Sequence, residues 1–188
     1  MQNNIFLTEH FCLKEFTESA TARKHGIVNE APPEAVENLK RLCEGCLEPL
    51  REKLGLPVII TSGYRTKALN SLLAHSSERS QHMLGCAADF YVGQAQVSGS
   101  KFQVSGDLKL ETGKSPMKLE TPRQRLIRAF RLIITDPNID FDQLILYSGF
   151  IHVSFVSKEK NRRGILLARS DGKLGYGRIS RGNALKIE

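Results

Sequence analysis

Two histidines and one aspartate in this sequence are residue types that could form a metal site. Asp89 lies within an apolar run that we expect to form a strand, and because burying an unpaired carboxylate is costly, its side chain needs a partner. His152 alternates with apolar residues in another expected strand, so it shares the polar face of that strand with Ser154. His82 lies in a predicted loop just before the strand of Asp89.

Two histidines and one carboxylate are enough to hold a catalytic zinc ion with one position left open. A non-haem iron centre uses the same ligand types. The spacing does not match the helical HExxH motif. From the residues alone, the alternative is that each histidine is an ordinary structural residue whose hydrogen bonds are satisfied.

The four cysteines suggest no second site. Cys43 and Cys46 have the CxxC spacing, but no second CxxC pair accompanies them, so a structural zinc site would lack half its ligands. Both fall on the apolar stripe of an expected helix, where cysteine behaves as a small hydrophobic residue. Four cysteines in 188 residues are not a disulfide scaffold. We therefore predict buried thiols rather than a redox pair.

The formal net charge of +7 is unevenly distributed, because nine of the 27 Lys and Arg residues lie within 156–188. A basic segment of this kind attracts nucleic acid or an anionic cell-wall polymer, or it is simply a solvated face. Aromatic residues do not alternate with the basic ones as they do in proteins that bind single strands. We expect a monomer without a nucleic-acid partner, and nucleic-acid binding is the alternative from a different functional class.

The composition is that of a globular protein, with 40% apolar and 25% charged residues. No stretch approaches the ~20 apolar residues that a membrane span requires. The first residues, Met1–Ile5, contain no basic region followed by an apolar run, so we predict no secretory signal. Such a start is typical of a cytoplasmic protein, and equally of a phage-encoded protein that reaches the cell wall by separate release.

The residues with candidate chemistry must be positioned by helices that come first and by strands that follow. Apolar spacing predicts helices over 8–25, 32–55 (kinked by Pro49), 67–74 and 121–135, with a polar loop over 75–81. Short apolar or alternating runs predict strands over 57–62, 85–92, 141–147, 150–155, 164–169 and 174–179. This order indicates an α+β fold, with N-terminal helices packed on a mainly antiparallel sheet.

Residues 93–121 differ from their surroundings, because they are rich in Gly, Ser, Thr, Lys and Gln and repeat two short tetrapeptides. We predict a hairpin or loop inserted into a single domain that spans 1–188, with a basic C-terminal segment over 156–188. After the insertion, Thr121 is expected to cap the next helix, and Gln124 completes a capping box.

Several motifs, in order along the chain, resemble those of the zinc D-Ala-D-Ala carboxypeptidase-like peptidase family. The central one is Ser80-x-His82-x-x-Gly85-x-Ala87-x-Asp89, followed far downstream by His152. Further similar segments are Leu13–Phe16, Ser19–Ala22, Leu47–Arg51, Ile60–Arg65, Phe141–Ile145 and Asn161–Arg163. That family includes the vancomycin-resistance dipeptidase and phage L-alanyl-D-glutamate endolysins, and it shares its fold with the Hedgehog signalling domain.

The resemblance implies a Hedgehog/DD-peptidase-like fold and a role for each motif residue. His82, Asp89 and His152 would be the zinc ligands. Arg65 would hold the carboxylate of the substrate, a role that suits a planar, permanently charged guanidinium. Ser80 would hydrogen-bond the substrate or the site wall. The implied activity is cleavage of peptidoglycan stem peptides, with zinc-activated water attacking the peptide carbonyl, either as a D-Ala-D-Ala carboxypeptidase or as an endolysin-like endopeptidase.

The sequence departs from the family pattern at the acid/base residue, which lies a few positions before the last zinc histidine and is usually Glu or His. Here Tyr147 stands five positions before His152 and Gly149 stands three before it. A phenol is a poor base at neutral pH, although it can donate to an oxyanion.

This departure leaves three outcomes open. Another carboxylate, such as Asp142 or Glu159, fills the gap; or zinc acts with slower turnover; or the chain is a catalytically impaired, zinc-containing module that binds peptidoglycan. Help from a general acid or base is worth about a hundred- to ten-thousandfold in rate, so these outcomes are distinguishable.

Overall fold

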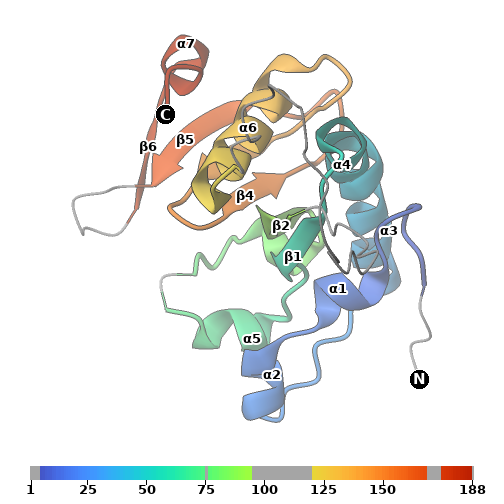
Figure 1. Ribbon diagram of the computed structural model, residues 1–188. Helices are drawn as coiled ribbons and strands as arrows, with labels where there is room; N and C mark the ends of the chain where they lie inside the picture. The colour runs from blue at the N-terminus through green and yellow to red at the C-terminus, as the bar shows by residue number, and fades with distance from the viewer. Residues whose placement is uncertain (1–4, 75, 95–119, 169–174, 188) are drawn as a thin grey trace, which may run out of the picture.

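The computed structural model describes residues 5–74, 76–94, 120–168 and 175–187, and these form a six-stranded sheet flanked by helices (Figure 1). The order in the sheet is β1-β2-β4-β3-β5-β6, and every neighbouring pair is antiparallel except β3 and β5. The strands are β1 (Val58–Ser62), β2 (Ala87–Val92), β3 (Gln143–Leu146), β4 (Ile151–Ser154), β5 (Gly164–Ala168) and β6 (Tyr176–Arg178). The predicted α+β class and the mainly antiparallel sheet are both confirmed.

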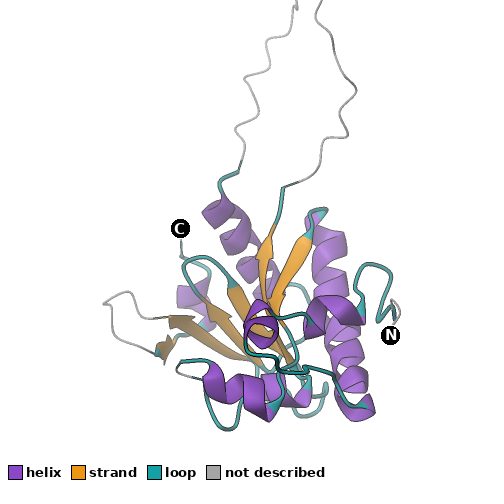
Figure 2. Cartoon of the chain, turned by 90° about the horizontal axis from the view of Figure 1, so that it is seen from below, coloured by secondary structure: helices purple, strands orange, loops and turns teal. Residues whose placement is uncertain are grey.

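Several helices precede the first strand and others lie between or after the strands, and together they flank the sheet on several sides (Figure 2). They are α1 (Leu13–Thr17), α2 (Ala20–Lys24), α3 (Pro33–Leu42), the π-helical turn η1 (Cys43–Leu47), α4 (Glu48–Leu54), α5 (Lys67–Leu72), the 3-10 helix η2 (Gln81–Leu84), α6 (Pro122–Thr135) and α7 (Arg181–Ala184). Just before Pro49, where the sequence predicts a kink, the helix contains the π-helical turn η1, and such turns are a common cause of helix bending.

One face of the sheet packs on α3, α4 and α6 to form the hydrophobic core. Fully buried members from these helices and from the central strands are Leu39, Leu42, Leu50, Phe90, Phe130, Ile151 and Val153. Along β4, Ile151 and Val153 point into this core, so His152 between them points to the opposite face. The predicted alternation in this strand is therefore correct, and it leaves the opposite face of the sheet to carry polar side chains.

Three elements differ from the predictions. The helix expected over 8–25 is two short helices, because Glu18 and Ser19 are extended and the Ser19 side chain accepts a hydrogen bond from Ala22 N at the start of α2. The loop expected over 75–81 gives way at Gln81 to the short helix η2, which ends at Gly85. The terminal helix α7 was not predicted.

The capping box at the start of α6 forms as predicted. Thr121 Oγ1 accepts a hydrogen bond from Gln124 N (3.2 Å), and Thr121 N donates to Gln124 Oε1 (2.8 Å). The inserted hairpin or loop predicted over 93–121 lies almost entirely outside the described residues. Among the helices that the structure describes, none has the length and apolar character of a bilayer span.

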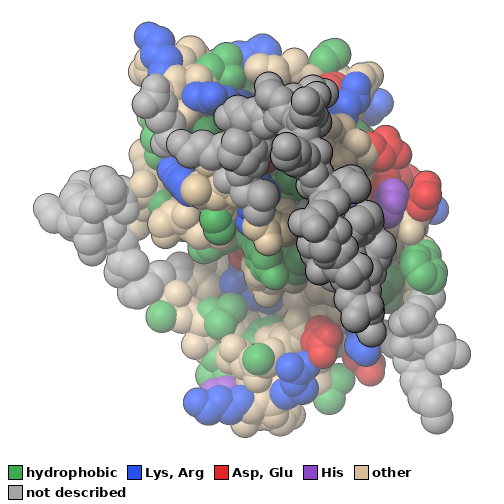
Figure 3. Space-filling model, in the orientation of Figure 1, with side chains coloured by type: hydrophobic (Ala, Val, Ile, Leu, Met, Phe, Trp, Pro, Cys, Tyr) green, Lys and Arg blue, Asp and Glu red, His purple; other side chains and the backbone are tan. Residues whose placement is uncertain are grey.

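The Lys and Arg side chains of the basic C-terminal segment are exposed where the structure describes them. The described basic residues of this segment are Lys158, Lys160, Arg162, Arg163, Arg178, Arg181 and Lys186. In the view of Figure 3, Lys and Arg side chains of the protein lie along the upper edge. Arg162 and Arg163 pair with Asp142 and Asp140. Two of its charges therefore take part in ion pairs within the protein.

The cysteines confirm the prediction of buried thiols. Cys43 and Cys46 are fully buried, and none of the four cysteines forms a disulfide. Burial raises the pKa of both Cys43 and Cys46 well above the usual value of a thiol, so neither is a reactive thiolate.

Candidate metal centre

Asp89 and His152 are brought together by the pairing of β2 with β4. The two residues are direct partners in the antiparallel register, so their side chains lie side by side on the same face of the sheet. His152 Nδ1 lies 2.8 Å from Asp89 Oδ1. Because an ionised carboxylate can only accept, the imidazole donates in this hydrogen bond. Thr61 on β1 donates to the backbone carbonyl of Asp89 (3.1 Å).

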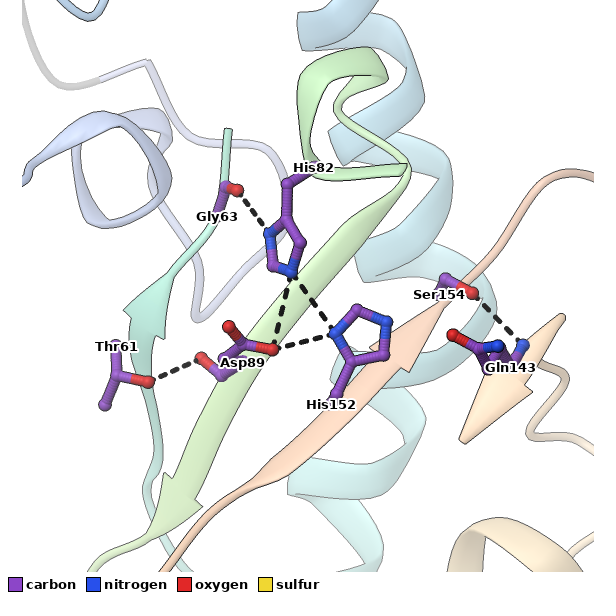
Figure 4. Close-up of polar contacts among 7 residues, drawn as sticks. All are labelled: Thr61, Gly63, His82, Asp89, Gln143, His152 and Ser154. Carbon is purple, nitrogen blue, oxygen red and sulfur yellow. Dashed lines mark hydrogen bonds and ion pairs between the residues drawn. The ribbon is translucent and has the colours of Figure 1, made fainter. Parts of the chain in front are cut away.

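His82 reaches the same point from the helix η2, outside the sheet (Figure 4). Its Nδ1 lies 2.7 Å from the backbone carbonyl oxygen of Gly63, at the end of β1. A carbonyl oxygen can only accept, so Nδ1 carries the proton and the neutral ring keeps a lone pair on Nε2. Nε2 lies 3.2 Å from His152 Nδ1 and 3.4 Å from Asp89 Oδ1.

The three ligand-type atoms form a small triangle that suits one metal ion. Bond lengths of about 2.0–2.2 Å in a tetrahedral zinc site put neighbouring ligand atoms about 3.3–3.6 Å apart. The two separations that involve His82 are close to this range. The separation between His152 and Asp89 is shorter because these atoms share a hydrogen bond, whose proton is the one that a metal would displace. The residues therefore fit a metal ion with a position left open.

Burial tunes the site toward the protonation states that metal ligands need. Burial lowers the pKa of His82, which is 2% exposed, so this imidazole is neutral at neutral pH. For Asp89, burial would raise the pKa, but the contacts of its carboxylate with His82 and His152 outweigh this effect, and the pKa falls well below its usual value. A neutral imidazole beside an ionised carboxylate is ready to bind a cation.

Gly85 fixes the end of the helix that carries His82. Its φ is +71°, and a Cβ atom there would clash with the backbone carbonyl of Ala35 on α3. The side chain of Asn38, also on α3, donates to the carbonyl of Leu84 (2.9 Å). The end of η2 is therefore held against α3 by a close backbone approach that only glycine permits.

We expect Gly85→Ala to destabilise the fold by about 2–4 kcal/mol, because it adds a steric clash to a left-handed backbone. Gly55→Ala is the matched control: Gly55 has a similar φ of +62°, but a methyl group added there would meet nothing within 4 Å. That variant should lose only about 1 kcal/mol. Urea unfolding measures both, and equal losses would show that the approach to Ala35 does not matter.

Arg65 lies beside the candidate metal centre. It lines a hollow of about 330 Å³ that also has Asp89 in its wall. Hydroxyl groups contribute much of the remaining lining, through Ser19, Thr21, Thr61 and Ser62, with Leu69 and Leu73. Arg65 is more than half buried, and its Nε has no hydrogen-bond partner among the described residues. Burial lowers its pKa and Asp89 opposes part of this effect, but a guanidinium stays charged at neutral pH.

Tyr147 and Ser80 are the other two predicted site residues. Along the chain, Tyr147 stands five positions before His152, and Ser80 stands two positions before His82. Tyr147 follows the end of β3, and its ring stacks on Phe150 with centroids 4.3 Å apart. Burial raises the pKa of Tyr147, and the charge of Asp89 adds to the effect. Ser80 directly precedes η2, and its backbone carbonyl accepts from Met83 N (3.1 Å).

The two carboxylates considered as substitute bases, Asp142 and Glu159, have lowered pKa values, which make them weaker bases. Asp142 is 1% exposed, and burial would raise its pKa, but hydrogen bonds from Arg162 and Gln81 lower it to about 2. A carboxylate held in this way is a very weak base. Glu159 is exposed on the turn after β4, where hydrogen bonds lower its pKa.

Sequence reasoning missed the groups that orient the histidines. The Gly63 carbonyl that binds His82 lies 19 residues away along the chain, and Gln81, which binds Asp142, is 61 residues from its partner. A backbone carbonyl acceptor such as that of Gly63 has no signature in the residue types.

A model of one protein family, described as Peptidase M15, matches residues 9–105, which is more than half of the chain. The match includes His82 and Asp89 but ends before His152, so the structure alone joins the third residue to the other two. No curated protein matches the chain.

Proposed function

The chain belongs to the peptidase M15 family of metallopeptidases, which are generally zinc-dependent, and on this basis we propose that it is a zinc peptidase acting on peptidoglycan stem peptides. It would act as a D-Ala-D-Ala carboxypeptidase or as an endolysin-like endopeptidase. The observation that carries this proposal is the convergence of His82, Asp89 and His152, whose ligand-type atoms lie 2.8–3.4 Å apart.

In this function His82 Nε2, Asp89 Oδ1 and His152 Nδ1 would hold the zinc ion. When bound, zinc supplies Lewis-acid chemistry, since it polarises a peptide carbonyl and acidifies water. The Tyr147 hydroxyl donates a hydrogen bond to the carbonyl oxygen as it gains charge, a task that its raised pKa does not prevent. Ser80, next to η2, contacts the substrate or the site wall.

Arg65 binds the free carboxylate of the peptide within the hollow beside Asp89. A charged side chain that is largely buried and keeps an unpartnered Nε among the described residues is suited to an anionic ligand. The volume of about 330 Å³ is at the lower end of ligand pockets, which favours a small peptide end over a long segment.

We expect Arg65→Lys to raise KM about tenfold or more for a peptide that ends in D-Ala-D-Ala, because lysine keeps the charge but loses the bidentate geometry. Zinc content should stay at the wild-type level. The same peptide with an amidated C-terminus is the control, because it has no carboxylate to bind and the two proteins should treat it alike. Equal KM values for wild type and variant on the peptide with a free carboxylate would show that Arg65 does not bind this carboxylate.

The second candidate function is a zinc-containing module that binds peptidoglycan without cleaving it. Tyr147 favours this candidate, since it stands where the family has an acid/base residue, and Asp142 is held by Arg162. Digestion of purified muropeptides separates the two functions. New peptide products that disappear when zinc is removed support the peptidase, and retention of intact muropeptides without products supports the module.

A further inference from the structure

His82 differs from the other two residues of the metal centre in how it is held. Asp89 and His152 are direct partners in the sheet, so the ladder between β2 and β4 sets their separation. His82 belongs to η2, a helix of four residues outside the sheet. Its distance from the other two therefore depends on the specific contacts that hold η2 in place.

Besides the contacts with α3 at Leu84 and Gly85, hydrogen bonds reach η2 from two further sides. On the β1 side, the Gly63 carbonyl accepts from His82 Nδ1, and Arg65 N donates to the His82 carbonyl (3.2 Å). On the β3 side, Gln81 Nε2 donates to Asp142 Oδ2 (2.9 Å). Apart from the contacts of His82 itself, this hydrogen bond of Gln81 is a second side-chain link from η2 to the region of β3 and β4.

Asp142 is itself firmly fixed. It accepts hydrogen bonds from the backbone N (2.9 Å), the Nε (2.8 Å) and the Nη2 (2.5 Å) of Arg162. Its own backbone N donates to the carbonyl of Ser154 (2.7 Å), two residues after His152 on β4. The carboxylate is almost fully buried, so it relies on these partners for compensation of its charge.

We propose that Asp142, oriented by Arg162, is a positioning residue of the metal centre. Through Gln81 it sets the distance between His82 on η2 and His152 on β4, and so it raises the affinity of the site for zinc. The inference rests on the metal centre of the proposed function. It also gives a role to a buried carboxylate whose oxygens are both occupied by Arg162 and Gln81.

The test is the zinc affinity of Gln81→Met, measured by competition with a chromophoric chelator. Methionine keeps the length of the side chain but cannot donate to Asp142. Partners that orient metal ligands are typically worth ten- to a hundredfold in affinity, and because Gln81 acts one residue away from its ligand, we expect about a tenfold loss. A Co²⁺-loaded sample should also show an altered visible absorption spectrum, which reports on ligand geometry.

Gln124→Met is the matched control, since it also removes one side-chain hydrogen bond of a glutamine, at the start of α6. It should lower the thermal midpoint without changing the zinc affinity or the cobalt spectrum. Unchanged affinity in Gln81→Met, with a wild-type protein that binds zinc, would overturn the positioning role alone. A wild-type protein that binds no zinc would overturn the metal centre, and the proposed function with it.

A double-mutant cycle tests whether Asp142 acts through Gln81. Asp142→Asn should also weaken zinc binding, and adding Gln81→Met to it should cost little more, because the link is already impaired. If the losses in zinc affinity of the two single variants add fully in the double variant, Asp142 does not act through Gln81. Should Asp142→Asn fail to fold, the Gln81→Met comparison still decides the proposal.

Discussion

His152→Ala is expected to lose its zinc ion and its peptide hydrolysis together. The change removes one of three side chains that hold the metal, from a position paired directly with Asp89 in the sheet. Structural zinc sites with four ligands bind with about 10–16 kcal/mol, so one ligand is worth a few kcal/mol, and zinc affinity should fall at least about a hundredfold. Metal content after dialysis and turnover on D-Ala-D-Ala peptides measure the two effects.

The control for this variant is His25→Ala. His25 is exposed at the end of α2, outside the triangle of ligand-type atoms, so it should keep full zinc content and turnover. A His152→Ala protein that retains one zinc ion per chain with unchanged affinity would show that the metal is held elsewhere.

Tyr147→Glu is expected to increase turnover at least tenfold. The raised pKa of the phenol keeps it from accepting a proton at neutral pH, whereas a carboxylate at this position would supply the missing base. The wild-type protein should be slow, zinc-dependent and faster at alkaline pH, because phenolate forms only above the ordinary tyrosine pKa. Initial rates on muropeptides from neutral to alkaline pH measure each effect.

Tyr147→Phe completes this comparison, because it keeps the ring that stacks on Phe150 and removes only the hydroxyl. It should reduce the remaining activity if the hydroxyl stabilises the developing charge. Rapid wild-type hydrolysis that neither change affects would place the base elsewhere. A complete lack of hydrolysis in both the wild type and Tyr147→Glu, with zinc present, would favour the binding module.

The placement of Asp89 and His152, the two candidate ligands on the sheet, was partly predictable because the alternation of side chains along a strand is a local property. Apolar neighbours of His152 predict which face it takes, and a carboxylate inside an apolar run predicts that Asp89 has a partner. The register that makes these two residues direct partners depends on pairing between segments 63 residues apart, which no local pattern encodes.

Two other features of the structure also lie outside what the spacing and the types of the residues predict. Nothing in the spacing of residues 8–25 predicts the break at Glu18, since apolar positions continue on both sides of it. Asp142 has the residue type of a base, and only its contacts with Arg162 and Gln81 show that it is bound to other groups. The type of a residue suggests a chemical role, whereas its contacts in the folded protein determine whether the side chain is free to perform that role.

Anomalous diffraction at the zinc edge, from crystals grown with zinc, tests the central claim most directly. The proposed function predicts one strong peak within about 2.0–2.2 Å of His82 Nε2, Asp89 Oδ1 and His152 Nδ1. A well-ordered protein with no peak between these three atoms, or with zinc held by other residues, would contradict it.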